Sequence, residues 1–159
     1  MSRRSQPERD SAQVLARNPK ARHDYHILET WECGLVLTGT EVKSVRAGRV
    51  SLKESFGVVR RGEVWLEGMH VAPYESSGYA GHDPLRPRKL LLHRREIRRL
   101  IGSVEQRGLT LVPLDLHVVR GRAKVALALA RGKKQHDKRE DLRRKDAERE
   151  VARAMSRRT

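Results

Sequence analysis

The clearest pattern in the chain is an alternation of apolar and polar positions over residues 109–118 and 122–131. A period of two is typical of strands that have one buried face. The dipeptide Arg120-Gly121 between the two segments indicates a tight turn. Pro113 indicates a bulge or a sheet edge within the first segment. The pattern therefore predicts two adjacent strands, with Val125, Leu127 and Leu129 on one face of the second and Lys124 on its outer face.

Further strands are predicted earlier in the chain. Residues 24–37 are rich in β-branched, aromatic and aliphatic side chains and are interrupted by Gly34, so we expect one long bent strand or two short ones. Residues 55–60 and 63–71 read as two strands joined at Arg61-Gly62, which is a hairpin signal. Residues 73–90 contain several prolines and glycines and predict a long loop.

Two short helices are predicted between these strands. Thr38 and Glu41 have the spacing of a capping box and Gly48 offers a stop, which indicates a helix of about two turns. A second helix is indicated by Ile97, Leu100 and Ile101, which share one helical face, and Gly102 should end it. Its opposite face carries Arg94, Arg95, Arg98 and Arg99.

The order of these elements predicts a mainly β fold. Many short strands with small helices favour a closed antiparallel barrel of the oligonucleotide-binding type over residues 18–131, and an open α+β sheet is the alternative. Residues 1–17 lack periodicity and are interpreted as a disordered basic extension. Residues 132–159 form a basic tail whose apolar stripe is mostly alanine. We expect this tail to be disordered, or partly helical, when free and to become a helix on an anionic surface.

The distribution of charge points to a partner. The 159-residue chain carries a net charge of +15, and its apolar share of 37% is low; about 45–50% is ordinary. The excess lies in residues 1–22, 86–99 and 132–159, at +4, +6 and +5, whereas the remainder is neutral. A neutral body with three basic segments favours a nucleic acid as the partner, with an anionic membrane surface second.

The sequence contains no residue pattern that is typical of a metal site or a catalytic site. Its seven histidines do not combine with Cys33 or with one another at a metal-ligand spacing; His23 and His26 should face opposite sides of a strand. The single cysteine excludes an internal disulfide. Neither a phosphate-cradling glycine loop nor a nucleophile elbow occurs. Glu32 could cap a turn, pair with a cation or accept hydrogen bonds from RNA hydroxyls. We expect no catalytic site, metal or cofactor.

Targeting signals are also missing from the pattern. No apolar run approaches the length that spans a bilayer. Residues 1–10 are basic and polar and lack the apolar stretch of a signal peptide. We therefore expect a cytoplasmic protein without a membrane partner.

Six short stretches stand in a characteristic order and spacing. They are Lys20-Ala21-Arg22-His23-Asp24-Tyr25, Gly39-Thr40-Glu41-Val42-Lys43-Ser44, Arg88-Lys89-Leu90-Leu91-Leu92-His93, Gly108-Leu109-Thr110-Leu111-Val112-Pro113-Leu114, Ala130-Arg131-Gly132-Lys133-Lys134 and Asp137-Lys138-Arg139. On these motifs the chain resembles the SsrA-binding protein family over residues 18 to about 155.

The resemblance implies a fold and a set of partners. The expected fold is an oligonucleotide-binding-like barrel of six antiparallel strands with three small helices. The expected ligand is the tRNA-like part of transfer-messenger RNA, delivered together with elongation factor Tu to stalled ribosomes in trans-translation. The family's tail then enters the empty messenger channel, at the decoding centre of the small subunit, and folds as a helix. The RNA is the adaptor, so the resemblance implies a monomeric binding protein and no enzyme.

The resemblance also assigns roles to individual residues. The RNA-binding set that we expect is Lys20, Arg22, Glu32, Arg88, Lys89, Leu91 and Lys124. The set expected at the decoding centre and on the ribosome is His23, Gly132, Lys133, Lys134, Asp137, Lys138, Arg139 and Met155. For Leu91 a place in the core is the alternative. Family members often carry bulkier side chains where Ala147 and Ala154 stand, which makes the docking of the tail less certain than RNA binding.

Two other interpretations stay open at this point. A basic ribosomal or ribosome-associated structural protein would have the same composition, but it would reside permanently on the ribosome. An RNA-modifying or RNA-cleaving enzyme would need titratable residues that converge in a pocket, and the pattern supplies none.

Overall fold

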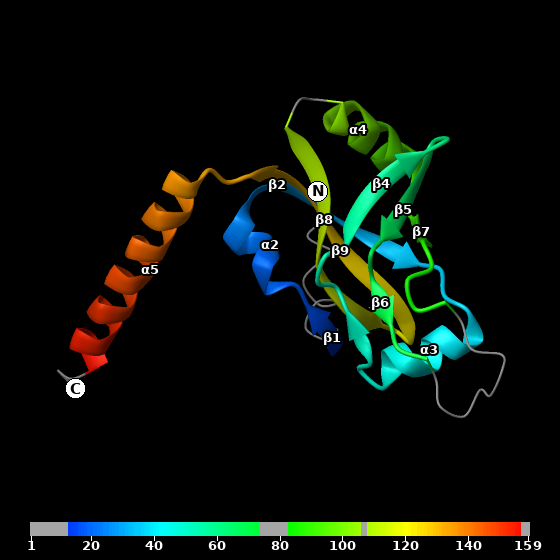
Figure 1. Ribbon diagram of the computed structural model, residues 1–159, viewed down its shortest axis with the longest axis horizontal. Coiled ribbons are helices and arrows are strands. Elements are labelled where there is room, and N and C mark those ends of the chain that lie inside the picture. The colour runs from blue at the N-terminus through cyan, green and yellow to red at the C-terminus, as the bar shows by residue number, and fades with distance from the viewer. Residues whose placement is uncertain (1–12, 74–82, 106–107, 157–159) are drawn as a thin grey trace.

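The computed structural model describes residues 13–73, 83–105 and 108–156, without the side chains of residues 135–137. Its elements in chain order are β1 (Gln13–Arg17), α2 (Pro19–Asp24), β2 (Tyr25–Leu35), α3 (Gly39–Arg46), β3 (Val50–Ser51), β4 (Phe56–Arg60), β5 (Glu63–Glu67), β6 (His70–Val71), β7 (Arg88–Leu91), α4 (Arg94–Val104), β8 (Leu109–Val119), β9 (Arg122–Gly132) and α5 (Gln135–Ser156). The strands form one body, and α5 extends away from it (Figure 1).

The main sheet contains seven antiparallel strands in the order β1-β8-β4-β5-β7-β2-β9. An additional antiparallel pairing joins β8 to β9, so the pairings of β8, β4, β5, β7, β2 and β9 run round a ring. The short strands β3 and β6 form a separate pair. The predicted mainly β class is therefore confirmed. The prediction of three small helices is exceeded, because the described residues contain four helices, of which α5 is long.

The predicted hairpins are confirmed at both turns. In the β8–β9 turn Arg120 and Gly121 have φ values of 50° and 76°, and in the β4–β5 turn Arg61 and Gly62 have 51° and 73°. Two successive residues with positive φ give the turn whose twist matches that of paired strands. The register of β8 against β9 shifts between Pro113 and Asp115, which confirms the predicted bulge.

Strand β2 is one long bent strand, which is the first of the two alternatives predicted for residues 24–37. Its register against β9 shifts between Ile27 and Glu29, which marks the bend. Beyond that bend Trp31, Cys33 and Leu35 are buried in the core, and Glu32 between them is exposed. This alternation matters for function because it presents every second residue of the strand to solvent.

The core is aliphatic and lies inside the ring of strands. Val125, Leu127 and Leu129 of β9 belong to it, which confirms the predicted inner face of that strand. A second, smaller cluster lies under α2 and contains Ala21, Val112, Ala128 and Ala130. Short side chains on β9 thus leave room for a helix to pack closely on its other face.

Three parts of the chain differ from the prediction. Residues 13–17 were expected to be disordered, but they form β1 along β8, where Leu15 and Ala16 pack against the core. Residues 19–24 form a helix that the sequence did not indicate, with Pro19 in its first turn. Helix α4 continues past Gly102 to Val104, because the side chain of Val104 packs on the core and a glycine costs a helix only about 1 kcal/mol.

The tail, which was expected to be disordered or partly helical when free, forms helix α5. It is continuous over Gln135–Ser156 and points away from the strands (Figure 1). Leu142, Val151 and Met155 on it are 48%, 58% and 69% exposed, so the helix buries no apolar face of its own. Within the described part of the chain, no helix is both long enough and apolar enough to cross a membrane.

Candidate nucleic-acid interface

One row of residues crosses four neighbouring strands at right angles to their direction. Gly34 of β2 is paired with Leu91 of β7 on one side and with Lys124 of β9 on the other. Lys124 is in turn paired with His117 of β8. Directly paired residues of antiparallel strands point to the same face. Leu91, Lys124 and His117 therefore share the outer face of the sheet.

Glu32 stands in the next row of the same face. It is two residues before Gly34 on β2 and is paired with Ala126, which is paired with Asp115 of β8. The side chain of Ala126 is short, so Glu32 and His117 can reach each other across β9. The two do meet, at 2.7 Å between Glu32 Oε1 and His117 Nε2.

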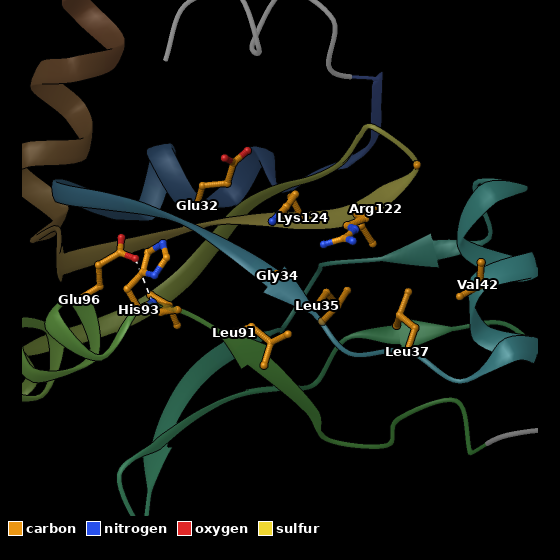
Figure 2. A pocket seen from close by; sticks show the side chains of 13 residues that line it. Glu32, Gly34, Leu35, Leu37, Val42, Leu91, His93, Glu96, Arg122 and Lys124 are labelled. Carbon is orange, nitrogen blue, oxygen red and sulfur yellow. Dashed lines mark hydrogen bonds between the residues drawn. The ribbon is translucent and has the colours of Figure 1, made fainter. Parts of the chain in front are cut away.

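A hollow of about 470 Å³ lies on this face (Figure 2). Its lining includes Glu32, Leu91 and Lys124, which are far apart in the sequence and which were all expected to bind RNA. Leu91 is 51% exposed, so the alternative of a core position is wrong. Val42 of α3 lines one end of the hollow, and His93 and Glu96 at the start of α4 line the opposite end (Figure 2).

Gly34 keeps this hollow open. A Cβ atom at position 34 would lie 3.2 Å from Leu91 Cβ and 3.5 Å from Leu91 Cδ1. Any larger residue would push Leu91 aside. The glycine that the sequence pattern marks as an interruption of the strand thus makes space for the exposed leucine beside it.

His117 is held between two carboxylates. Its Nδ1 lies 2.7 Å from Asp115 Oδ1, and its Nε2 makes the contact with Glu32. The hydrogen bond to Asp115 raises the pKa of His117; burial opposes this, and the hydrogen bond to Glu32 adds to it. The imidazole is mostly buried, whereas about half of the Glu32 side chain is exposed. One oxygen of the Glu32 carboxylate is therefore fixed by His117, while about half of the side chain stays accessible to a ligand.

The outer face of α4 supplies positive charge next to the hollow. Arg94, Arg95, Arg98 and Arg99 are all exposed, as the helical pattern predicts. Arg99 Nε lies 3.1 Å from Glu29 Oε1 of β2, which ties the helix to the strand that carries Glu32. His93 begins the helix, where its backbone N–H donates to Glu96 Oε1 at 3.2 Å.

Arg88 is not available as an RNA contact, which corrects the prediction made for it. Its side chain is fully buried, its Nε donates to Glu41 Oε2 at 2.5 Å, and its Nη1 donates to the carbonyl of Met69 at 2.8 Å. Arg86 donates to the other oxygen of Glu41 at 2.5 Å. The motif that contains Arg88 thus serves the fold, through a buried ion pair between β7 and α3. Its neighbour Lys89 stays at the surface and pairs with Glu63 at 3.1 Å.

Burial alone would raise the pKa of Glu41. The hydrogen bonds from Arg86 and from the Thr38 backbone, with the charge of Arg88, outweigh that effect and lower the pKa to about 2. Glu41 is thus ionised under all ordinary conditions. It also accepts a hydrogen bond from the Thr38 N–H at 2.9 Å, which confirms the predicted capping box.

Some of the other expected residues meet at a second place, where α2 lies against the start of α5. Lys133 Nζ donates to the Arg22 carbonyl at 3.0 Å and also contacts Asp141 of α5. Lys138 of α5 pairs with Asp24 at 3.3 Å. The junction therefore fixes the base of α5 on the end of α2.

His23 lies in this junction, and the prediction that it would sit in a strand is wrong. It is in α2, with its Nδ1 2.9 Å from Asp24 Oδ1. That hydrogen bond is the main reason why the pKa of Asp24 is lowered; burial opposes it, and the hydrogen bond from Lys138 adds to the lowering. Lys20 is also on α2 and lies 3.9 Å from Glu54, with both side chains largely exposed.

The other tail residues are not brought to the hollow. Gly132 ends β9 opposite Tyr25. Lys134, Arg139 and Met155 are exposed, and the side chain of Asp137 lies outside the described residues. The structure thus brings some of the expected site residues to a hollow on the sheet and others to a junction at the base of the tail, whereas Lys20, Arg88, Lys89 and Met155 lie in neither place.

Nothing in the described part of the chain resembles a metal or redox centre. Its His, Cys, Asp and Glu side chains form no group of three or more that could hold a metal ion. Cys33 is buried in the core, and burial raises its pKa to about 12, so the thiol is not a nucleophile at neutral pH.

The fold and the site together define a class: a small, basic, mainly β protein with a hollow on the outer face of its sheet and exposed arginines on the neighbouring helix α4. The family model described as SmpB protein matches residues 15–157. The chain belongs to this SmpB protein family.

Individual relatives agree with that assignment. The SsrA-binding protein of Thermosynechococcus vestitus is 59% identical over 150 residues, which cover 94% of this chain and 99% of that protein. The SsrA-binding protein of Bacillus subtilis is 59% identical over 145 residues, which cover 91% of this chain and 93% of that protein. A solved chain described as "tmRNA-SmpB: a journey to the center of the bacterial ribosome" is 56% identical, with a TM-score of 0.64, and the match covers 80% of this chain and 94% of that one.

Proposed function

We propose that this protein binds transfer-messenger RNA and acts with it on the ribosome in trans-translation. The observation that carries the proposal is the convergence of Glu32, Leu91 and Lys124 from three strands on one hollow. Membership of the SmpB protein family and the likeness to a chain whose description names tmRNA and the bacterial ribosome support it.

Each of the three side chains offers RNA a different contact. Lys124 is a cation on an open surface and suits a phosphate. The carboxylate of Glu32 accepts hydrogen bonds and suits a ribose 2′-hydroxyl or a base amino group. Leu91 is an exposed apolar side chain that a ribose or a base can cover. The combination recognises an RNA fold rather than a base sequence.

The arginines of α4 extend this surface. Successive arginines on one helical face are about 6 Å apart along the axis, from a rise of about 1.5 Å per residue. Backbone phosphates are the natural ligands of such a strip, because guanidinium groups bind phosphate oxygens with paired hydrogen bonds. Lys89, Lys20 and Arg22 lie outside the lining of the hollow and belong to the periphery of the proposed RNA surface.

The junction and α5 would serve the ribosome. We assign His23, Gly132, Lys133, Lys134, Asp137, Lys138, Arg139 and Met155 to contacts with the decoding centre and the messenger channel. What supports this is the shape of α5, which is exposed along most of its length and is held at its base by Lys133 and Lys138, together with the net charge of +5 on residues 132–159. A rod of that kind can enter a channel lined by ribosomal RNA.

Other parts of the proposal follow from the RNA. Elongation factor Tu would act through the charged RNA, the protein would be a monomeric binding protein and not an enzyme, and work on the ribosome would place it in the cytoplasm. We further propose that the ring of six strands corresponds to an oligonucleotide-binding-like barrel, which the antiparallel order and the hollow on its face favour.

Binding measurements on single variants test the RNA surface. Glu32→Ala and Lys124→Ala should each weaken binding of transfer-messenger RNA, whereas Arg61→Ala, an exposed cation in the β4–β5 turn, should not. Unchanged affinity of both Glu32→Ala and Lys124→Ala refutes the assigned surface.

Truncation after Gly132 tests the division between body and tail. The shortened protein should still bind the RNA, because the core of the body contains no residue of α5. It should fail to support tagging of stalled peptides in a translation assay. A shortened protein that also lost RNA binding would show that the two parts do not have separate roles.

A further inference from the structure

We propose that His117 is a positioning residue for RNA recognition, because as an imidazolium it holds Glu32 in place and neutralises the carboxylates beside the hollow. The proposal rests on the proposed function, since it concerns how Glu32 meets RNA. His117 is not one of the residues that line the hollow, but it contacts Glu32, which is. Its effect on the hollow is indirect, through one hydrogen bond to Glu32 and another to Asp115.

The hydrogen bonds determine the protonation state. Ionised carboxylates only accept hydrogen bonds, and each ring nitrogen of His117 lies 2.7 Å from a carboxylate oxygen. Both nitrogens must therefore donate, which requires the imidazolium. A neutral imidazole could donate to one carboxylate only, and its second nitrogen would face the other carboxylate with a lone pair.

The groups around His117 agree with this state. On its own strand Asp115 contacts it, from β2 Glu32 contacts it, and on β9 Lys124 is its paired residue. On β1, Val14 is paired with His117 and Arg17 is paired with Asp115. The two carboxylates thus have His117 between them and one further cation on either flanking strand.

Loss of the proton would harm RNA binding in two ways. The single remaining N–H would stay with Asp115, whose hydrogen bond has the larger effect on the pKa of His117, and Glu32 would lose the hydrogen bond that fixes its carboxylate. More rotamer freedom of Glu32 would then be lost when RNA binds. The surface would also lose one positive charge close to the place where Lys124 meets phosphate. Both effects weaken binding. Because the imidazolium is the form that binds, affinity should be full at low pH and fall as pH rises through the raised pKa of His117.

The experiment measures the dissociation constant of the full-length protein for transfer-messenger RNA from pH 6 to 9 at constant salt. Native protein should lose affinity across this range by roughly tenfold, which is ordinary for coupling between two sites. His117→Gln, which cannot carry the charge, should bind as weakly at pH 6 as the native protein does at pH 9. His70→Gln, a change at an exposed histidine on β6, should keep the native profile.

A second variant keeps the test decisive if His117→Gln fails to fold. Asp115→Asn retains an acceptor for Nδ1 but removes a charge, so the fall in affinity should move to lower pH. A profile that is the same in the native protein, His117→Gln and Asp115→Asn overturns the inference. If Glu32→Ala still weakens binding in that case, the proposed RNA surface stands and only the role of His117 is wrong. If Glu32→Ala and Lys124→Ala both have no effect, the proposed function fails at this surface.

Discussion

The buried ion pair between Glu41 and Arg88 makes a strong prediction about stability. Both side chains are fully buried, and Glu41 also accepts a hydrogen bond from Arg86. Glu41→Gln keeps the shape of the side chain but leaves the Arg88 guanidinium buried without a counter-ion. The lowering of the Glu41 pKa from 4.5 to about 2 means that the ionised carboxylate stabilises the folded state by about 3 kcal/mol at neutral pH. Breaking a buried pair by removing one partner typically costs about 3–5 kcal/mol.

Urea unfolding followed by circular dichroism measures this difference. At pH 7 Glu41→Gln should lower the free energy of unfolding by about 3 kcal/mol. Because the folded pKa of Glu41 is lowered, its contribution is present above the unfolded value and is lost as pH falls from 4.5 towards about 2. The gap between native protein and variant should therefore close in acid.

Glu63→Gln is the matched control for this prediction. It breaks the exposed pair with Lys89, which should be worth less than about 1 kcal/mol. If Glu41→Gln is as mild as Glu63→Gln, or if its effect does not depend on pH, the reasoning about the buried pair is refuted.

Three other predictions concern packing and charge. Gly57→Ala should lower the free energy of unfolding by about 1–3 kcal/mol, because a Cβ atom at position 57 would lie 2.8 Å from Leu111 Cβ. An unchanged urea midpoint would contradict the close approach of β4 and β8. Gly34→Val should displace Leu91 and weaken RNA binding more than it weakens the fold, which parallel binding and unfolding titrations would compare; equal losses would count against an open hollow. Removing three α4 charges should reduce the slope of log affinity against log salt by about 2–3. Changing three exposed cations elsewhere should have a smaller effect. If the two triple variants have equal slopes, α4 is not part of the RNA surface. The α4 set is Arg94→Gln, Arg95→Gln and Arg98→Gln, and the control set is Arg46→Gln, Lys53→Gln and Arg61→Gln.

The sequence predicted local features well, because local residues determine them. The turn at Arg120-Gly121 was read from two residues, and its geometry sets the register of the whole β8–β9 hairpin. That register pairs His117 with Lys124, so the sequence contained a signal for His117 that the pattern of apolar positions alone did not reveal. The bulge at Pro113 and the capping box of α3 were predicted for the same reason.

Long-range contacts account for what the sequence did not reveal. Arg88 appears in a basic segment and was assigned to RNA, but its partner Glu41 is 47 residues away and buries it. The contact of Glu32 with His117 spans 85 residues and depends on the register of β2 against β9. Residues 13–17 form a strand only because β8 offers an edge to pair with. In each case a partner that is remote in the chain overrides the local pattern.

Binding of transfer-messenger RNA in the presence of excess bulk tRNA, at fixed near-physiological salt, tests the central claim most directly. Salt must be held constant, because any protein with a charge of +15 binds RNA non-specifically at low salt. Selective binding that survives the competitor in the native protein, and that is lost in Lys124→Ala, is the expected result. Equal competition by bulk tRNA would contradict the claim and would favour a basic structural protein of the ribosome.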